Sequence, residues 1–515
     1  MDKNSFVASI NKSYTLNGAT IFLGAGILEG EILKDAKVNL SLRMMNRHGL
    51  VTGATGSGKT RTLQLIAEQL STAGVPVFIP DIKGDLSGLA KEGETNDKIT
   101  ERARALGINF APTAFPVELY SLSGKLGAQM RATVTEFGPV LLSKILELND
   151  VQTGVLNVLF KYADDKNLPI VDLNDLKKVL TYLSEGQGAL EIKNDYGKIS
   201  TSTSGTILRK IVALEQEGVN QIFGERSFDI DDLFGKVDGR GVISILNVSD
   251  MQSKPSVFST FMLALLAELY QSLPEVGDLD KPKLIFFIDE AHLLFKDASK
   301  AFMEQIEQVI RLIRSKGVGI FFCTQLTQDV PLTVLSQLGN RVHHVIRAFT
   351  PNDVKALRET IKTFPRSEFY SMEEQFTQLG TGQAFITVLN EKGIPTETVV
   401  THLIPPASVM GPLPADEYKA LFESSDLYKK YKDSVDPQSA YEILDERIQR
   451  HQEKEEEMRE ERSADRGGRT TRREKSTLEQ VMQSSVARQM GREIVRGVFG
   501  MLFGKTTRSR SKSIF

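Results

Sequence analysis

Residues 53–60 read G-A-T-G-S-G-K-T, and no other stretch of the chain constrains its fold as strongly. Residues 44–52 before it end in an apolar run, and residues 61–70 after it carry apolar side chains at helical spacing. A strand, a glycine-rich loop and a helix in this order form a P-loop, whose backbone N–H groups surround phosphate. A plain Gly/Ser linker would not lie between a buried strand and an amphipathic helix, so we predict a P-loop.

Each residue type in this loop serves nucleotide binding. Glycine allows backbone turns that a Cβ atom would block, and the positive end of the following helix attracts phosphate. We expect Lys59 to reach the β- and γ-phosphates and the Thr60 hydroxyl to bind Mg²⁺. The predicted nucleotide-binding residues are Gly53, Ala54, Thr55, Gly56, Ser57, Gly58, Lys59, Thr60 and Arg61.

A second candidate lies where the apolar run 284–288 ends in Asp289, Glu290, Ala291 and His292. A carboxylate at the carboxyl end of a buried strand near a P-loop is placed to hold Mg²⁺ through water. We therefore predict that Asp289 is a metal ligand with Thr60 and that Glu290 is the general base for the attacking water. In the alternative reading, the acidic pair caps the next helix. His292 either couples to Glu290 or packs within the helix.

Polar residues also follow two other apolar runs. Gln325 follows residues 318–323, and an amide there can orient water or sense the γ-phosphate. Asp81 ends the run 75–80 and would reinforce the metal site or contact another strand. Residues 247–250, N-V-S-D, lack the lysine of the guanine-reading N-K-x-D pattern, so we expect ATP rather than GTP.

Composition limits the class of protein. The 515 residues are 41% hydrophobic and 25% charged, which is typical of a soluble globular chain of two or three domains. The single cysteine, Cys323, excludes an intramolecular disulfide and fits a reducing compartment. We see neither a secretory signal nor an apolar run long enough to span a membrane, so we expect a cytoplasmic protein. Because the net charge is only -3, any nucleic-acid surface must be local.

Short apolar runs alternate with helical patterns, which predicts an α/β fold with a mostly parallel sheet covered on both faces. Residues 1–47 show short β patterns, whereas residues 116–235 show mainly helical periodicity. The predicted parts are a short N-terminal β appendage (1–47), a first part of the ATPase core (48–115), a helical insertion (116–235), a second part of the core (236–405) and a helical, partly flexible C-terminal tail (406–515).

Together, G-A-T-G-S-G-K-T, I-P-D-I-K-G-D, L-I-F-F-I-D-E-A-H and G-V-G-I-F-F-C-T-Q resemble the motifs of the HerA/FtsK superfamily of motor ATPases, and within it the bacterial YjgR-type HerA-like proteins. The motifs occur in the family's order over about residues 40–405, with a helical insertion between the second and third. The resemblance implies a RecA-like P-loop NTPase core. It also implies the roles given above for Lys59, Thr60, Asp289, Glu290 and Gln325.

The resemblance further implies a homo-oligomeric ring, usually a hexamer, that translocates on double-stranded DNA. In such rings a neighbouring subunit donates an arginine to the transition state. Arg311 and Arg314 lie in the region where the family carries basic residues, and Arg341 and Arg347 are rivals. The residues before the P-loop are too few for the N-terminal β-barrel with which archaeal HerA proteins dock partners, so protein partners are left open.

The C-terminal residues carry a separate charge pattern. Residues 441–461 are acidic, and residues 462–515 hold 13 Lys/Arg against four Asp/Glu. Residues 478–502 are amphipathic, with Arg488, Arg492 and Arg496 on one face. This segment packs on a subunit, binds DNA phosphates or lies on a membrane surface.

For the whole chain, the leading hypothesis is an ATP-hydrolysing DNA translocase or helicase-like motor. The alternatives are a secretion- or conjugation-type ATPase that acts on protein, and a nucleotide-gated scaffold with little turnover.

Overall fold

The computed structural model describes residues 2–251, 254–295 and 300–465, so the amphipathic segment 478–502 lies outside the described residues. The chain forms two compact units. The first consists of Met1–Arg131 and Arg226–Ser434. The second consists of Ala132–Glu225 and the described residues from Val435 onward.

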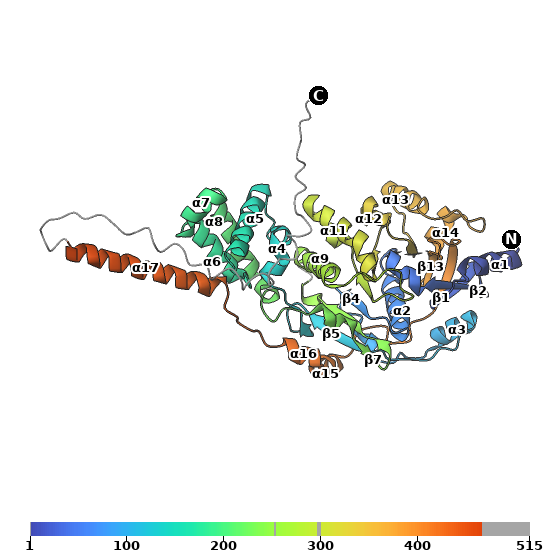
Figure 1. Cartoon of the computed structure of the whole chain (residues 1–515). Coiled ribbons are helices and arrows are strands. Elements are labelled where there is room, and N and C mark those ends of the chain that lie inside the picture. Colours follow the sequence, from blue (N-terminus) through green and yellow to red (C-terminus); the bar gives the residue numbers. More distant parts are fainter. Residues whose placement is uncertain (1, 252–253, 296–299, 466–515) are drawn as a thin grey trace, which may run out of the picture. The chain divides into compact units, whose positions relative to one another are not determined.

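A 12-stranded sheet forms the centre of the first unit (Figure 1). Its strands from β12 to β6 run parallel to their neighbours, and those from β2 to β13 extend it by antiparallel pairing. In spatial order the strands are β2 (Glu31–Ser41), β1 (Thr20–Leu28), β14 (Val399–Leu403), β13 (Gln383–Thr387), β12 (Asn340–His343), β3 (Gly49–Thr52), β11 (Val318–Thr324), β10 (Leu284–Ile288), β4 (Val77–Asp81), β9 (Ile243–Asn247), β5 (Val117–Ser121) and β6 (Ala128–Gln129). The predicted α/β fold with a mostly parallel sheet is confirmed.

The helices of the first unit pack against this sheet. They are α1 (Lys3–Tyr14), α2 (Lys59–Thr72), α3 (Asp97–Leu106), α9 (Pro255–Ser272), α10 (His292–Phe295), α11 (Lys300–Ile313), α12 (Leu332–Leu335), α13 (Pro351–Ile361), α14 (Met372–Gln378), α15 (Ala415–Ser424) and α16 (Asp426–Tyr431). Shorter elements include the 3-10 helices η1 (Leu42–Arg47), η4 (Ile230–Phe234) and η6 (Arg314–Lys316), and the ribbon of β7 (Lys236–Val237) and β8 (Arg240–Gly241).

The core follows from the alternation of side chains along buried strands. Ile285 and Phe287 of β10 share one apolar cluster with Leu63 and Ile66 of α2. Phe286, between them, points to the opposite face and stacks on Phe78 at 4.7 Å between ring centroids. Because all five residues of β10 are buried, both faces of the strand are covered, as in doubly wound folds.

The N-terminal segment differs from the short β patterns predicted for residues 1–47. It begins with helix α1, because the Asp2 carboxylate caps the N–H groups of Asn4 and Ser5. Phe6, Ile10 and Tyr14 recur every four residues and are buried. This helical spacing outweighs the β-forming residues around position 14. The β1–β2 hairpin that follows extends the central sheet rather than forming a separate layer.

The second unit is helical. It comprises α4 (Val134–Ile145), α5 (Asp150–Asp165), α6 (Leu173–Ser184), α7 (Gly188–Asp195), α8 (Thr201–Gln216) and α17 (Ala440–Asp465). Although α17 is far away in sequence, it starts on α6, where Asp175 accepts hydrogen bonds from the Ser439 hydroxyl and the Tyr441 N–H. The inserted helices are therefore narrower than the predicted range 116–235, since β5 and β6 join the main sheet.

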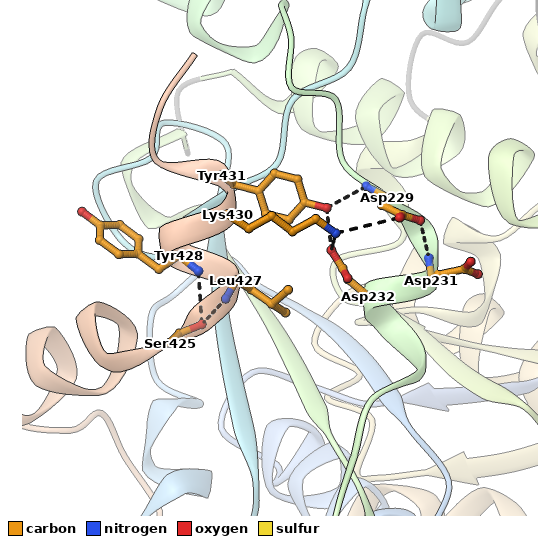
Figure 2. Close-up of polar contacts among 8 residues, drawn as sticks. All are labelled: Asp229, Asp231, Asp232, Ser425, Leu427, Tyr428, Lys430 and Tyr431. Atoms are coloured by element: carbon orange, nitrogen blue, oxygen red, sulfur yellow. Dashed lines mark hydrogen bonds and ion pairs between the residues drawn. The ribbon is translucent and has the colours of Figure 1, made fainter. Parts of the chain in front are cut away.

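Residues 406–434 return to the first unit and are fastened there by the contacts drawn in Figure 2. Asp232 of η4 accepts hydrogen bonds from Lys430 Nζ, at 2.8 Å, and from the Tyr431 hydroxyl of α16. The Tyr431 hydroxyl in turn accepts the Asp229 N–H at 3.0 Å. Burial and the Asp232 carboxylate raise the pKa of Tyr431 to about 12, so the phenol stays protonated and remains a donor.

Candidate active site

The P-loop connects β3 to α2, as the sequence predicts. Gly53 has φ 145°, and a Cβ atom there would lie 2.5 Å from Cβ of His344. Gly58, with φ 114°, directly precedes α2. The loop is fastened to the neighbouring β12 segment by the Ala54 N–H, which donates to the Val345 carbonyl at 2.9 Å. Gly53 therefore meets a steric demand of the packed sheet, and both glycines supply the positive φ that the loop needs.

Lys59 lies across its own loop. Its Nζ donates to the Gly53 carbonyl at 2.7 Å and to the Ala54 carbonyl at 3.2 Å. Burial lowers the pKa of Lys59, whereas the Glu290 and Asp289 carboxylates act in the opposite direction. The Lys59 ammonium group and the Asp289–Glu290 pair therefore interact electrostatically within a single site, although they are far apart in the sequence.

Strand order explains this meeting. β11 lies between β3 and β10, with Thr324 opposite Thr52 on one side and Phe322 opposite Ile288 on the other. All three strands are parallel, so their carboxyl ends share one edge of the sheet. Asp289 is therefore two strands from the P-loop, about 10 Å in the direction of the hydrogen bonds.

Glu290 has an unusual backbone and a partly free carboxylate. Its φ is 47°, a conformation that costs a non-glycine residue free energy and that is concentrated at functional sites. Its side chain is 15% exposed. Oε1 lies 4.0 Å from Lys83 Nζ, and Oε2 lies 3.4 Å from His292 Nδ1. Within the described residues Oε2 is buried and has no hydrogen-bond partner, so it is available to a water molecule or a substrate.

Asp289 is half-buried beside a second carboxylate. Burial, and then the Glu290 charge, raises the pKa of Asp289 to about 7. The Glu290 N–H, which donates to Asp289 Oδ1 at 3.0 Å, and the lysines Lys83 and Lys59 oppose this shift only in part. A carboxylate that is this hard to ionise is suited to binding a cation, because the positive charge of the cation stabilises the ionised form.

The pH dependence of stability follows from this pKa. The folded value is raised above the unfolded value of about 3.9, so the folded state holds a proton that the unfolded state has already lost. The free energy of unfolding therefore falls as pH rises from about 4 to about 7. Asn at this position has no proton to lose. We expect Asp289→Asn to match the parent near pH 4 and to become more stable above pH 7, by at most about 4 kcal/mol.

Urea unfolding in the presence of a chelator, followed at several pH values, tests this prediction. Asp416→Asn is the matched control, because Asp416 is an exposed acid on α15. The raised pKa of Asp289 would be contradicted if the two variants differed from the parent by the same amount at every pH.

The residues present fit a nucleotide with Mg²⁺. Thr52 Oγ1, Ser57 Oγ and Glu290 Oε2 are all buried without a hydrogen-bond partner among the described residues. Unpaired buried polar atoms are costly unless a ligand satisfies them. The described residues contain no group of three or more His, Cys, Asp or Glu that would hold a metal by themselves. Mg²⁺ commonly needs only one or two carboxylates together with the substrate phosphates, and Asp289 and Thr60 supply such a partial set.

Two other predicted residues lie at the same edge. Gln325 follows β11 directly, beside the start of the P-loop, and is exposed. Arg61, in the first turn of α2, donates to Gln64 at 2.8 Å and lies 3.8 Å from Asp85.

Asp81 contacts another strand through its backbone, which pairs with Asn247 of β9, and its side chain is used locally. Its carboxylate accepts the N–H groups of Gly84, Asp85 and Leu86, at 2.7, 3.2 and 2.9 Å. Both oxygens are used in shaping the turn that carries Lys83.

The candidate arginines lie elsewhere. Arg311 lies in the last turn of α11 and Arg314 begins η6, just before β11, so both are at the amino edge of the parallel strands, opposite the P-loop. Arg341 donates to the carbonyls of Leu335, Leu338 and Thr363, which makes it a structural residue. Arg347 is exposed after β12. Within one chain, neither Arg311 nor Arg314 can reach the P-loop of the same subunit.

Two residues near the site were missed by the sequence analysis. Lys83 faces Glu290, and His344 accepts or donates a hydrogen bond with Thr62 Oγ1 at 2.9 Å behind the P-loop. Burial lowers the pKa of His344 to about 3, so the ring is neutral. The signals were present, in the I-K-G-D segment and in the His343-His344 pair at the end of a strand, but neither pattern specifies a contact.

Comparison with known proteins gives consistent results. A family model described as Helicase HerA-like C-terminal matches residues 27–508. The DNA double-strand break repair helicase HerA of Sulfolobus acidocaldarius is 22% identical over 437 residues, which cover 81% of this chain and 77% of that protein. The DNA import protein CedB of the same organism is 24% identical over 311 residues, covering 59% and 45%.

Among solved structures, the bacterial conjugative coupling protein TrwB has a TM-score of 0.47 at 15% identity, over 78% of this chain and 100% of that one. VirB4 of Thermoanaerobacter pseudethanolicus has a TM-score of 0.44 at 15% identity, over 75% and 97%. No helix among the described residues combines the length and apolar character needed to cross a bilayer.

Proposed function

Because this chain belongs to the HerA-like helicase family and is an ATP-hydrolysing enzyme, we propose that it is a motor that acts on double-stranded DNA. The observation that carries the proposal is the acidic pair at the end of β10, where Glu290 Oε2 is buried without a hydrogen-bond partner, 3.4 Å from His292 Nδ1 and near Asp289 and Lys59. Several relatives are named as DNA-repair helicases or as a DNA import protein, which supports DNA as the substrate.

In the proposed mechanism, P-loop N–H groups and Lys59 bind the phosphates of ATP, and Thr60 and Asp289 hold Mg²⁺. When bound, Mg²⁺ neutralises charge that develops on the phosphate oxygens. Glu290 Oε2 accepts a proton from the attacking water, and Lys83 keeps the neighbouring oxygen, Oε1, close to a positive charge. Gln325, beside the P-loop, orients that water or senses loss of the γ-phosphate.

We further propose that the enzyme works as a homo-oligomeric ring, hexameric as in the family. An arginine that serves a neighbour's nucleotide must lie away from its own P-loop, and Arg311 and Arg314 meet that requirement. Analytical ultracentrifugation with and without ATP measures the subunit number.

Linear double-stranded DNA is expected to raise the ATP hydrolysis rate, and the stimulation should fall steeply with salt because phosphate contacts release counterions. The measurement is steady-state ATPase activity against DNA concentration at several salt concentrations. Single-stranded DNA and RNA of equal phosphate content, and heparin, serve as controls for simple polyanion binding.

If ATP hydrolysis is found but no nucleic acid changes its rate at low salt, DNA is not the substrate, and the secretion- or conjugation-type alternative gains support. If ATP binds but is not hydrolysed under any condition, the chain acts as a nucleotide-gated scaffold.

A further inference from the structure

A pocket of about 460 Å³ opens at the amino edge of the sheet, opposite the P-loop. Arg47 precedes β3, Arg314 precedes β11, and Gly339 precedes β12, and all three residues line it. Since β3 has four residues, the pocket is about 13 Å or more from the P-loop. Its volume is in the range of small-molecule binding sites, which is about 300–1,000 Å³.

Three guanidinium groups meet at this pocket with little to neutralise them. Within the described residues, the side chains of Arg47 and Arg311 form no hydrogen bond or ion pair. Arg314 has one weak partner, Asp278, at 3.9 Å. Arg341 also lines the pocket, but its donors are used by three carbonyls.

The remaining lining adds no charge at neutral pH. No acidic side chain lines the pocket in the described part of the chain. His48 accepts the Ile320 N–H and donates to the Ile310 carbonyl, and burial lowers its pKa to about 4. Partial burial and the Arg314 charge lower the pKa of the Arg47 guanidinium, and the Asp278 carboxylate opposes this shift in part. A bound anion would reduce the electrostatic repulsion between these arginine side chains.

We propose that Arg47, Arg311 and Arg314 form a second phosphate-binding site, which takes a compact polyphosphate such as the terminal phosphates of a nucleoside triphosphate. Arginine suits this ligand because its planar donors bind phosphate oxygens in pairs. The three side chains come from η1, α11 and η6, and they converge on one concavity rather than forming a row.

The surroundings favour a compact ligand over a nucleic-acid strand. The segment 275–280 carries Glu275, Asp278 and Asp280, all exposed. It packs on the residues just before β11, since the Val276 N–H donates to the Ser315 carbonyl at 2.9 Å. A long polyanion that followed this edge of the sheet would meet all three carboxylates, whereas a ligand confined to the pocket would meet only Asp278, the partner of Arg314.

Two sources offer the same phosphates. One is free nucleotide or polyphosphate, and this source does not depend on the proposed motor function. The other is the nucleotide bound to the P-loop of a second copy of the chain, and this source rests on the proposed ring. Arg47 would then join Arg311 and Arg314 in contacting the neighbour's nucleotide.

The first experiment uses the full chain with Lys59→Ala, so that the P-loop contributes little, and inorganic tripolyphosphate as the probe in titration calorimetry. We expect one site per chain, weakened about 10–100-fold when Arg47→Ala or Arg311→Glu is added. Arg311 is exposed, so its reversal leaves folding intact even where Arg47→Ala does not. Arg358→Ala, which removes an exposed arginine paired with Glu373, should leave binding unchanged.

The second experiment distinguishes the sources. Lys59→Ala chains, which keep the pocket, are mixed with Arg47→Ala/Arg311→Glu chains, which keep the P-loop. Recovery of ATP hydrolysis in the mixture identifies a second copy's nucleotide as the ligand, whereas binding of tripolyphosphate without recovery identifies a free ligand.

The inference is overturned if neither result is obtained, or if short duplex DNA, but not tripolyphosphate, binds in an Arg47- and Arg311-dependent way. Tripolyphosphate binding by a chain that never hydrolyses ATP would overturn the motor and leave the pocket standing.

Discussion

Glu290→Gln is expected to lower the rate of ATP hydrolysis by about 10²–10⁴-fold, the usual contribution of a general base. Glutamine keeps the shape of the side chain but cannot accept the proton of the attacking water. ATP binding should persist, because the P-loop and Lys59 are unchanged. The variant should therefore hold unhydrolysed ATP, which retention of labelled nucleotide on the purified protein measures alongside single-turnover kinetics.

Glu304→Gln is the matched control for this variant. Glu304 lies on α11 with its side chain 65% exposed, and its Oε1 lies 3.9 Å from Lys300 Nζ, one turn away. It should hydrolyse ATP at the parent rate. Equal turnover by Glu290→Gln and the parent would show that another group accepts the proton, and His292, 3.4 Å from Glu290, would be the next residue to replace.

Lys59→Ala is expected to lower the hydrolysis rate by about 10²–10³-fold, as when one preorganised donor to a developing anion is removed. ATP affinity should fall as well, by about 10–100-fold, because a charge-assisted contact to phosphate is lost. The variant also removes the hydrogen bonds from Lys59 Nζ to the Gly53 and Ala54 carbonyls, which stabilise the loop when no ligand is bound. Steady-state kinetics and equilibrium binding of a fluorescent nucleotide measure the two effects.

Lys362→Ala is the control for charge removal. Lys362 directly follows α13, is 69% exposed and pairs with Glu359. It should change neither quantity. A Lys59→Ala chain that bound and hydrolysed ATP like the parent would mean that the G-A-T-G-S-G-K-T loop is not the nucleotide site.

The sequence predicted the buried strands better than the elements at the margins of the sheet. Residues 284–288 and 318–323 were predicted as strands, and β10 and β11 occupy almost the same positions, because buried parallel strands are continuous apolar runs. β5 was missed within the expected insertion, since Val117–Ser121 alternates with polar residues near the end of the sheet. Helix α1 was missed because its apolar residues are sparse and its cap, Asp2, is the second residue of the chain.

For the candidate site too, the sequence predicted some residues and missed others. Lys59, Asp289 and Glu290 were predicted as site residues from the chain alone, because each motif combines a local structure with a charged group at its end. The contacts of Lys83 with Glu290, of His344 with Thr62 and of Arg47 with Arg314 were not predicted. Each of these contacts joins segments that are far apart in the sequence, so no local sequence pattern predicts it.

What the sequence by itself determined is the set of local units: a glycine loop before a helix, an acidic pair after a buried strand, and apolar runs that become parallel strands. The tertiary structure alone decided which units meet. The order β3–β11–β10 places Lys59 near the acidic pair. In the same parallel arrangement, Arg311 and Arg314 lie at the amino edge of the sheet, opposite the P-loop. The physical reason is that strand order depends on long-range packing, whereas glycine turns, helix caps and apolar periodicity depend on neighbours along the chain.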